Sequence, residues 1–231
     1  MSLEVNRVEE KYLLTCLQAK QLRNRLKNVL PGDAFNGYKP YPVRSVYFDS
    51  YYDDDYYDKL AGVQLRKKVR LRTYATGSDK AKLEIKQKDD ANQCKRSLTV
   101  TRQEAEALIA GDHSFLKDRE EEYARQLFYI FEKEVYRPKS LVEYRRVAFE
   151  GPANNIRITF DSDVRASEGC FDLFGEHTKA LRPVQEMNQV VLEVKYNHFL
   201  LSYIKDILAT VDVPQESFSK YVAGRYYGLL G

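Results

Sequence analysis

Strict alternation of charged and apolar residues is the feature that most limits how this chain can fold. In residues 65–74, LRKKVRLRTY, the alternation places Lys68, Arg70 and Arg72 on one side and Val69 and Leu71 on the other. Residues 80–88 alternate in the same way. A period of two matches an extended strand, whose successive side chains point to opposite faces. We therefore predict two strands here, and the TGSD sequence at 76–79 predicts the hairpin loop that joins them.

Other segments extend this pattern into a fold. Six more segments read as strands: 4–14, 43–48, 94–100, 139–149, 155–161 and 183–196. Thr15 and Thr101 each precede a Gln or Glu by three residues, which predicts two helix starts. Four more helices are predicted, at 51–61, 120–133, 199–210 and 215–229. We predict an α+β fold with about eight strands in an antiparallel sheet or a closed barrel, and a single domain over 1–231 because no Pro/Gly/Ser-rich linker divides the chain.

The charges are unevenly placed on these strands. The chain is nearly balanced, with 37 Lys and Arg against 34 Asp and Glu, yet the polar faces of the seven most charged strands carry eleven basic and three acidic residues. Two arrangements are open: the basic faces lie in water, or they line the lumen of a tunnel. Buried cations in such excess would need a polyanion or water as partner. The compensating acids, such as those at 53–55 and 120–122, are expected on helices at the periphery.

Several classes of protein are excluded by the sequence. No apolar run reaches the roughly 18 residues of a spanning helix, and no secretory signal opens the chain. Cys16, Cys94 and Cys170 form no metal-binding or disulfide pattern, so we expect a cytoplasmic location. No P-loop occurs, so any triphosphate must be held by side chains. No aromatic RNA-binding motif is present, and we do not expect a nucleic-acid partner.

Eight short motifs occur in a fixed order along the chain: RVEEKY at 7–12, RSVYFD at 44–49, KVRLR at 68–72, LEIK at 83–86, YRRVAF at 144–149, RITFD at 157–161, LEVKY at 192–196 and SFSKY at 217–221. Together they resemble the VTC domain, the catalytic domain of inorganic polyphosphate polymerases among the triphosphate tunnel metalloenzymes. The resemblance implies a closed eight-stranded antiparallel β-barrel, flanked by amphipathic helices, that forms a tunnel with a basic lumen. Such a tunnel would bind ATP and transfer its γ-phosphate to a growing polyphosphate or pyrophosphate.

The resemblance also implies the roles of particular residues. The phosphate ligands would be Lys11, Arg70, Arg72, Lys86, Arg146, Arg157 and Lys220. Further contacts would come from Glu9, Lys195, Tyr144, Ser219 and Arg96, although Lys95 fits the motif as well as Arg96 does. Glu193 would hold Mn²⁺ or Mg²⁺. Glu9 has two readings, a metal or water contact and an ion-pair partner of Lys11, and Glu84 is expected to pair with arginine rather than bind metal.

Two other functions share this pattern. A tunnel triphosphatase would use water in place of the phosphate chain, but such hydrolases usually keep a second acid where this chain has Arg7. A polyphosphate-binding module without activity would keep the cations alone. The resemblance further implies a membrane-protein partner that exports the product, which would associate this chain with a membrane it does not itself span.

Overall fold

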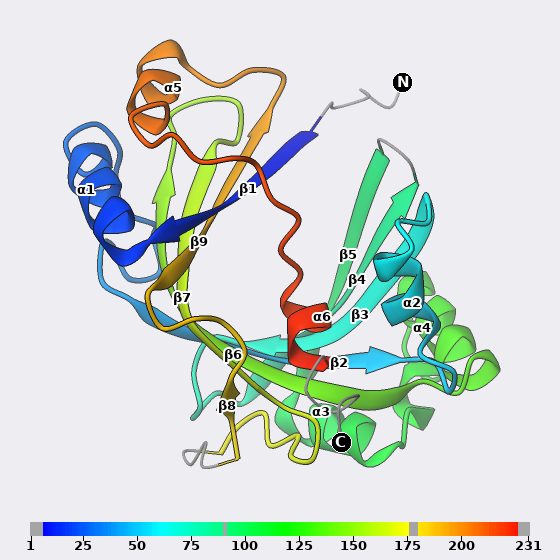
Figure 1. Ribbon diagram of the computed structural model, residues 1–231. Helices are drawn as coiled ribbons and strands as arrows, with labels where there is room; N and C mark the ends of the chain where they lie inside the picture. The colour runs from blue at the N-terminus through cyan, green and yellow to red at the C-terminus, as the bar shows by residue number, and fades with distance from the viewer. Residues whose placement is uncertain (1–6, 90–91, 176–179, 226–231) are drawn as a thin grey trace. The chain divides into compact units, whose positions relative to one another are not determined.

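The computed structural model describes residues 7–89, 92–175 and 180–225 (Figure 1). Its strands pair antiparallel and its helices are short. In chain order the elements are β1 (Arg7–Thr15), α1 (Cys16–Leu26), β2 (Tyr41–Asp49), α2 (Asp54–Leu60), β3 (Leu65–Thr73), β4 (Lys80–Asp89), β5 (Asn92–Thr101), α3 (Arg102–Ala110), η1 (Ser114–Leu116), α4 (Glu122–Lys133), β6 (Arg137–Glu150), β7 (Arg157–Ser167), β8 (Arg182–Pro183), β9 (Gln189–Asn197), α5 (Ser202–Leu208) and α6 (Lys220–Arg225).

The sheet differs from the predicted barrel in two respects. Its strands follow the order β1-β9-β7-β6-β2-β3-β4-β5, and β8 pairs with β7, so the described residues form nine strands rather than eight. Within those residues no pairing joins β1 to β5, and the sheet is not closed. The α+β class and the antiparallel pairing are confirmed, whereas the closed eight-stranded barrel is wrong.

The outer edge of β1 pairs with residues 215–216, so it does not need another strand as its partner. Residues 215–216 run along this edge: Gln215 bridges to Tyr12, and the Glu216 N–H donates to the Lys11 carbonyl at 2.8 Å. An exposed strand edge needs such partners for its backbone groups. The same pairing corrects the helix predicted over 215–229. In the described part of that range the helix is only α6, because residues 215–219 are not helical; residues 226–229 lie outside the described part.

The chain divides into two compact units. Unit 1 consists of Met1–Pro42, Tyr144–Val164 and Gln185–Ser219, and unit 2 consists of Val43–Glu143, Arg165–Val184 and Lys220–Gly231. The strands β6 and β7 contribute residues to both units. The single domain predicted over 1–231 stays a prediction.

In unit 1, two helices cover the apolar face of β1, β9 and β7 (Figure 1). Leu22 and Leu26 of α1 and Ile204 of α5 are buried against strand residues such as Leu192 and Ile158. The helix α1 begins where it was predicted, since Thr15 and Gln18 form a reciprocal capping box. Because the helices occupy the apolar face, the charged face of these strands points the other way.

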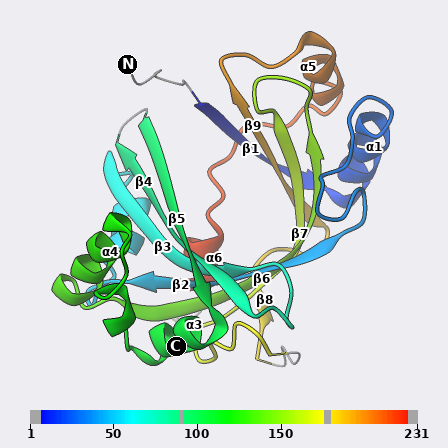
Figure 2. The ribbon, with the colours of Figure 1, turned by 180° about the vertical axis from the view of Figure 1, so that it is seen from behind.

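Unit 2 repeats this arrangement with β3, β4 and β5. Leu71, Leu83 and Leu98 lie opposite one another in the register and are buried beneath α3 and α4 (Figure 2). The helix α3 also begins at a predicted capping box, formed by Thr101 and Glu104. None of the helices in the described ranges is long and apolar enough to cross a membrane.

Candidate functional site

The polar face of β3, β4 and β5 in unit 2 is a grid of cations around one carboxylate. Residues directly opposite in the register share a face, so the pairing places side chains in rows across the three strands. The rows are Lys68-Lys86-Lys95, Arg70-Glu84-Ser97 and Arg72-Lys82-Thr99. We call Lys68, Arg70, Arg72, Glu84, Lys86 and Lys95 the Glu84 cluster.

Glu84 binds three of these cations. Its Oε1 lies 2.6 Å from Lys95 Nζ and 2.5 Å from Arg72 Nη2, and its Oε2 lies 2.9 Å from Arg70 Nε. Burial raises the pKa of Glu84, but the charges of the two arginines and of Lys95 outweigh burial and lower that pKa to about 2. The prediction that Glu84 pairs with arginine is confirmed. The carboxylate orders three long basic side chains that mutual repulsion would otherwise spread apart.

Lys95, and not Arg96, belongs to this cluster. Arg96 lies opposite Ile85 in the register, so it shares the face that α4 covers. Its Nη1 donates to Gln126 Oε1 of α4, at 2.5 Å. The structure therefore separates Arg96 from the other predicted phosphate ligands, and the two residues that the motif left open are distinguished by strand parity.

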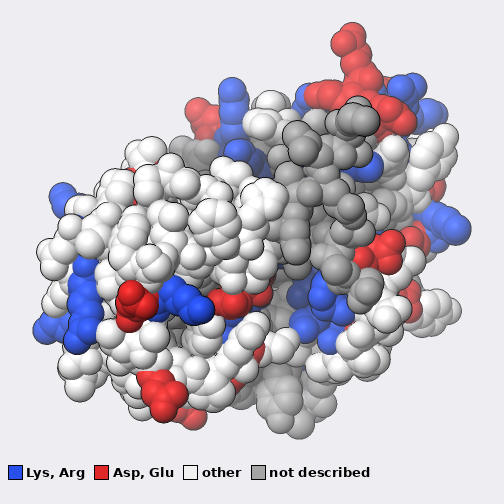
Figure 3. Space-filling view, turned by 90° about the horizontal axis from the view of Figure 1, so that it is seen from above, with Lys and Arg blue, Asp and Glu red and all other residues white. Residues whose placement is uncertain are grey.

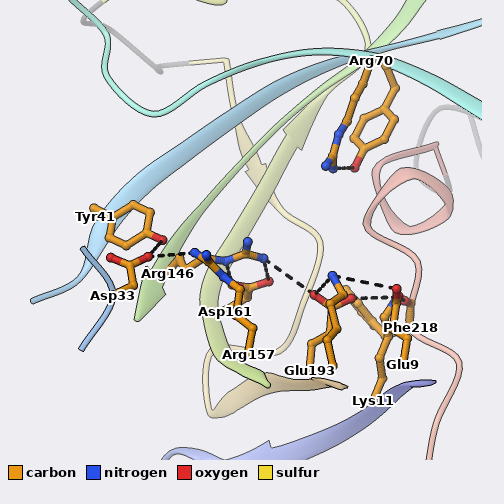
Figure 4. Close-up of polar contacts among 12 residues, drawn as sticks. Glu9, Lys11, Asp33, Tyr41, Arg70, Arg146, Arg157, Asp161, Glu193 and Phe218 are labelled. Carbon is orange, nitrogen blue, oxygen red and sulfur yellow. Dashed lines mark hydrogen bonds and ion pairs between the residues drawn. The ribbon is translucent and has the colours of Figure 1, made fainter. Parts of the chain in front are cut away.

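The polar face of β1 and β9 in unit 1 carries alternating charges. Glu9 lies opposite Lys195, and Lys11 lies opposite Glu193. Lys11 Nζ is 3.2 Å from Glu9 Oε1 and 3.6 Å from Glu193 Oε1, while Lys195 Nζ is 2.9 Å from Glu193 Oε2 (Figure 4). Burial lowers the pKa of Lys195, and the two glutamates oppose that shift. These contacts support the ion-pair role of Glu9.

Arg146 extends this network on β6. Its Nε and Nη2 donate to the two carboxylate oxygens of Asp161, each at 2.7 Å, and its Nη2 lies 4.0 Å from Glu193 Oε2 (Figure 4). Burial would lower the pKa of Arg146, but Asp161 raises that pKa well above its ordinary range. The ring of Tyr144 lies 5.2 Å from the Arg146 guanidinium carbon. We call Glu9, Lys11, Arg146, Asp161, Glu193 and Lys195 the Glu193 cluster.

Arg157 joins the same face through a second aspartate. It lies opposite Lys195 in the register, and its Nη2 donates to Asp33 Oδ2 at 2.8 Å. The Tyr41 hydroxyl donates to the same oxygen at 2.7 Å, and Asp33 is buried. The turn that holds this aspartate is fixed because the Phe35 and Asn36 N–H groups donate to Asp33 Oδ1.

Apart from Arg96, the predicted site residues fall into three groups. Unit 1 brings together Glu9, Lys11, Tyr144, Arg146, Arg157, Glu193 and Lys195, and unit 2 brings together Arg70, Arg72 and Lys86. The SFSKY motif lies on the last segment: Phe218 accepts a hydrogen bond from Lys11 at 3.3 Å, Ser219 follows it, and Lys220 begins α6. Sequence reasoning missed Asp33 and Asp161. Asp161 had a signal, because it shares strand parity with Arg157 and Thr159 in RITFD.

The predicted separation of a basic lining from an acidic periphery holds only in part: residues 120–122 are exposed, but other carboxylates lie among the basic residues. Asp33, Asp161 and Glu84 are buried next to the basic residues that they neutralise. Asp55, expected on a solvated helix end, is also buried. Lys and Arg lie beside Asp and Glu on the face shown in Figure 3. Burying cations without such partners would cost several kcal/mol each, which explains the intermixed charges.

Comparison with known proteins agrees with the motifs. The sequence profile of the VTC domain matches residues 6–227. The chain belongs to the VTC domain family. No curated protein matches it. Among solved structures, a proposed adenylate cyclase (bh2851) from Bacillus halodurans has a TM-score of 0.53 at 12% identity, over 93% of this chain and 95% of that chain, which shows a shared fold. The PH1819 protein from Pyrococcus horikoshii OT3 has a TM-score of 0.47 at 11% identity, over 97% of each chain. The VTC match supports a phosphate-related enzyme.

The VTC family implies a divalent metal, and the oxygen atoms near Glu193 fit one. Glu9 and Glu193 each contact Lys11, and the Thr159 hydroxyl lies opposite Glu193 in the register. That hydroxyl is buried and has no hydrogen-bond partner in the described part of the chain. No group of three acidic, His or Cys side chains that could hold a metal occurs in the described ranges. Mg²⁺ commonly uses one or two carboxylates plus substrate phosphates and water, and this donor set suits that mode.

Proposed function

We propose that this chain is a metal-dependent polyphosphate polymerase that transfers the γ-phosphate of ATP to a growing polyphosphate chain. The observation that carries the proposal is the placement of the family's basic motif residues. Lys11, Arg146 and Arg157 share one polar sheet face in unit 1, and Arg70, Arg72 and Lys86 share another in unit 2. Lys95 replaces Arg96 among the proposed phosphate ligands because it lies on the same face as Lys86.

Phosphoryl transfer suits a site of this composition. The reaction needs the donor and acceptor held in line and their oxygen charges neutralised, and it needs no protein nucleophile. Arginine can hold two phosphate oxygens at once, whereas lysine acts as a compact charge. Alternate residues of a strand lie about 6.6–7 Å apart, so Arg70 and Arg72 can contact neighbouring parts of one phosphate chain.

Each residue type has a defined part in the proposed reaction. The arginines of each cluster would orient phosphates and neutralise phosphate oxygens on their own sheet face. Glu84 and Asp161 hold those arginines in place. Glu193, with the Thr159 hydroxyl, would hold Mn²⁺ or Mg²⁺, while Glu9 stays paired with Lys11. That metal would supply positive charge to the phosphate oxygens. A cytoplasmic location and a membrane-protein partner stay predictions from the family.

The test is product analysis with matched variants. Purified protein is incubated with ATP and Mn²⁺, and polymer is measured by gel electrophoresis after phosphatase treatment. We expect phosphatase-resistant polymer from the wild type, and its loss in Lys11→Ala and in Arg70→Ala. Lys20→Ala, on the exposed side of α1, is the control and should retain activity.

The other functions give different products. Free phosphate without polymer would refute the polymerase and identify a triphosphatase. Tripolyphosphate binding in calorimetry without any metal-dependent ATP turnover would also refute it, and would identify a binding module. Equal polymer formation by Lys11→Ala and the wild type would remove the proposed role of the Glu193 cluster.

A further inference from the structure

A buried aspartate at the end of β2 collects hydrogen bonds from three segments of unit 2. Asp49 is fully buried. Its Oδ1 accepts from the Ser50 and Asp55 N–H groups at 2.8 and 2.9 Å, and its Oδ2 accepts from the Tyr56 N–H at 3.0 Å. The fourth donor is the Tyr221 hydroxyl of α6, at 2.5 Å. Because a buried carboxylate needs such donors, Tyr221 is fixed relative to β2.

Tyr221 in turn packs on a residue that contacts Arg70. Its ring stacks on Tyr47, with centroids 5.1 Å apart and an interplanar angle of 23°. The Tyr47 hydroxyl accepts a hydrogen bond from Arg70 Nη1 at 3.1 Å (Figure 4), and Tyr47 lies directly opposite Arg70 in the register. Glu84 at Nε and Tyr47 at Nη1 are therefore among the supports of the Arg70 guanidinium.

The helix α6 does not depend on Tyr221 alone. Arg225 Nη2 lies 2.8 Å from Asp53 Oδ2, and the Ser140 hydroxyl donates to the Gly224 carbonyl at 3.2 Å. Gly224 packs so closely that an added Cβ would lie 2.7 Å from Ser140 Oγ. Removing one hydroxyl from Tyr221 therefore leaves α6 docked, and its effect should reach Arg70 through the stacked ring.

We propose that Asp49 and Tyr221 are positioning residues that orient the Arg70 guanidinium through Tyr47. The proposal rests on the proposed function in one respect, since it treats Arg70 as a phosphate ligand. It assigns a role to the aspartate of the RSVYFD motif and to the tyrosine of the SFSKY motif, which no phosphate contact explains. Asp49 and Tyr221, the last residues of these motifs, are 172 residues apart in the sequence, and unit 2 contains both.

The test compares Tyr221→Phe and Tyr47→Phe with a matched control. Tyr136→Phe is that control, because Tyr136 is a buried tyrosine of unit 2 whose hydroxyl donates to a buried aspartate, Asp55, at 2.8 Å. It should lose similar stability without touching Arg70. Two readouts are used: the ¹⁵N NMR signal of the Arg70 Nε–H group, and the calorimetric affinity for tripolyphosphate.

We expect the Arg70 signal to shift and broaden in Tyr221→Phe and Tyr47→Phe but not in Tyr136→Phe. We expect both variants to bind tripolyphosphate about tenfold more weakly, since a hydrogen bond to a charged group is lost or misaligned. The double variant should bind no more weakly than Tyr47→Phe, because both act through one contact.

The outcomes separate the inference from the proposed function. An unchanged Arg70 signal in Tyr221→Phe overturns the inference, whatever the activity. A changed signal with unchanged tripolyphosphate affinity supports the positioning of Arg70 and instead refutes its role as a phosphate ligand. Equal changes in Tyr136→Phe would show a general loss of packing and would also overturn the inference.

Discussion

Replacing Glu84 with glutamine removes one charge from the centre of three cations. Glu84 is buried and contacts Arg70, Arg72 and Lys95 at 2.5–2.9 Å. Glutamine keeps the shape and one carbonyl oxygen, but it leaves the three cations without their anion. Removing one partner of a buried ion pair typically costs about 3–5 kcal/mol.

A second route gives a similar magnitude. The contacts with the three cations outweigh burial and lower the pKa of Glu84 from 4.5 to about 2. At 1.36 kcal/mol per pKa unit this corresponds to about 3 kcal/mol of stability. Because the folded pKa is lower than the unfolded one, this stability is fully present above about pH 4.5 and is lost as the pH falls toward about 2. We therefore expect Glu84→Gln to lower the free energy of unfolding by about 3–5 kcal/mol at pH 7.

Urea unfolding followed by circular dichroism measures this loss at pH 7 and at steps between pH 5 and pH 2. The difference between wild type and Glu84→Gln should shrink across the acid range. Glu106→Gln is the control: its ion pair with Arg102 lies on the exposed surface of α3, and removing such a pair changes stability little. Two results would refute the reasoning. One is a free energy of unfolding for Glu84→Gln within about 1 kcal/mol of the wild-type value at pH 7. The other is a difference between the two proteins that stays the same at pH 2.

Two further predictions concern unit 2. Burial raises the pKa of Asp55 to about 7 despite the nearby charge of Lys67. The unfolding free energy should therefore fall as the pH rises from about 4 to about 7, by up to about 1.4 kcal/mol per pH unit. Asp55→Asn should flatten this slope in urea titrations, and an equal slope in both proteins would contradict the prediction. Leu83→Ala should lower the unfolding free energy by about 2–5 kcal/mol in urea unfolding, because Leu83 is completely buried. Leu17→Ala, at a residue 65% exposed, should change it little in the same assay.

The strands could be predicted because their pattern is local. Alternation along 65–74 and 80–88 gave β3 and β4 nearly to the residue, and two capping boxes located the starts of α1 and α3. The predictions of a closed sheet and of a helix over 215–229 were wrong, because both features depend on pairing between residues distant in the sequence. Extended residues at 215–216 lie on the edge of β1, and no feature of that segment's own sequence indicates this partner.

The basic residues of the site could be predicted, but two of their carboxylate partners, Asp33 and Asp161, could not. The cations recur in short motifs with strand spacing, so their faces follow from parity. Asp33 lies in a turn outside every motif, and it reaches Arg157 across 124 positions of sequence. Asp161 is inside a motif, yet its pairing with Arg146 depends on the neighbouring strand. Strand parity could have chosen Lys95 over Arg96, because only Lys95 shares the face of Lys86.

The carboxylates that hold the cations also turn phosphate binding into an anion exchange. In the Glu84 cluster an incoming phosphate competes with a counterion that is part of the protein, so a single phosphate exchanges one set of ion pairs for another and gains little. A chain of linked phosphates differs, because once one group has exchanged, the next arrives at a high effective concentration. Built-in counterions would thus favour long phosphate chains over free phosphate without any contact that measures length.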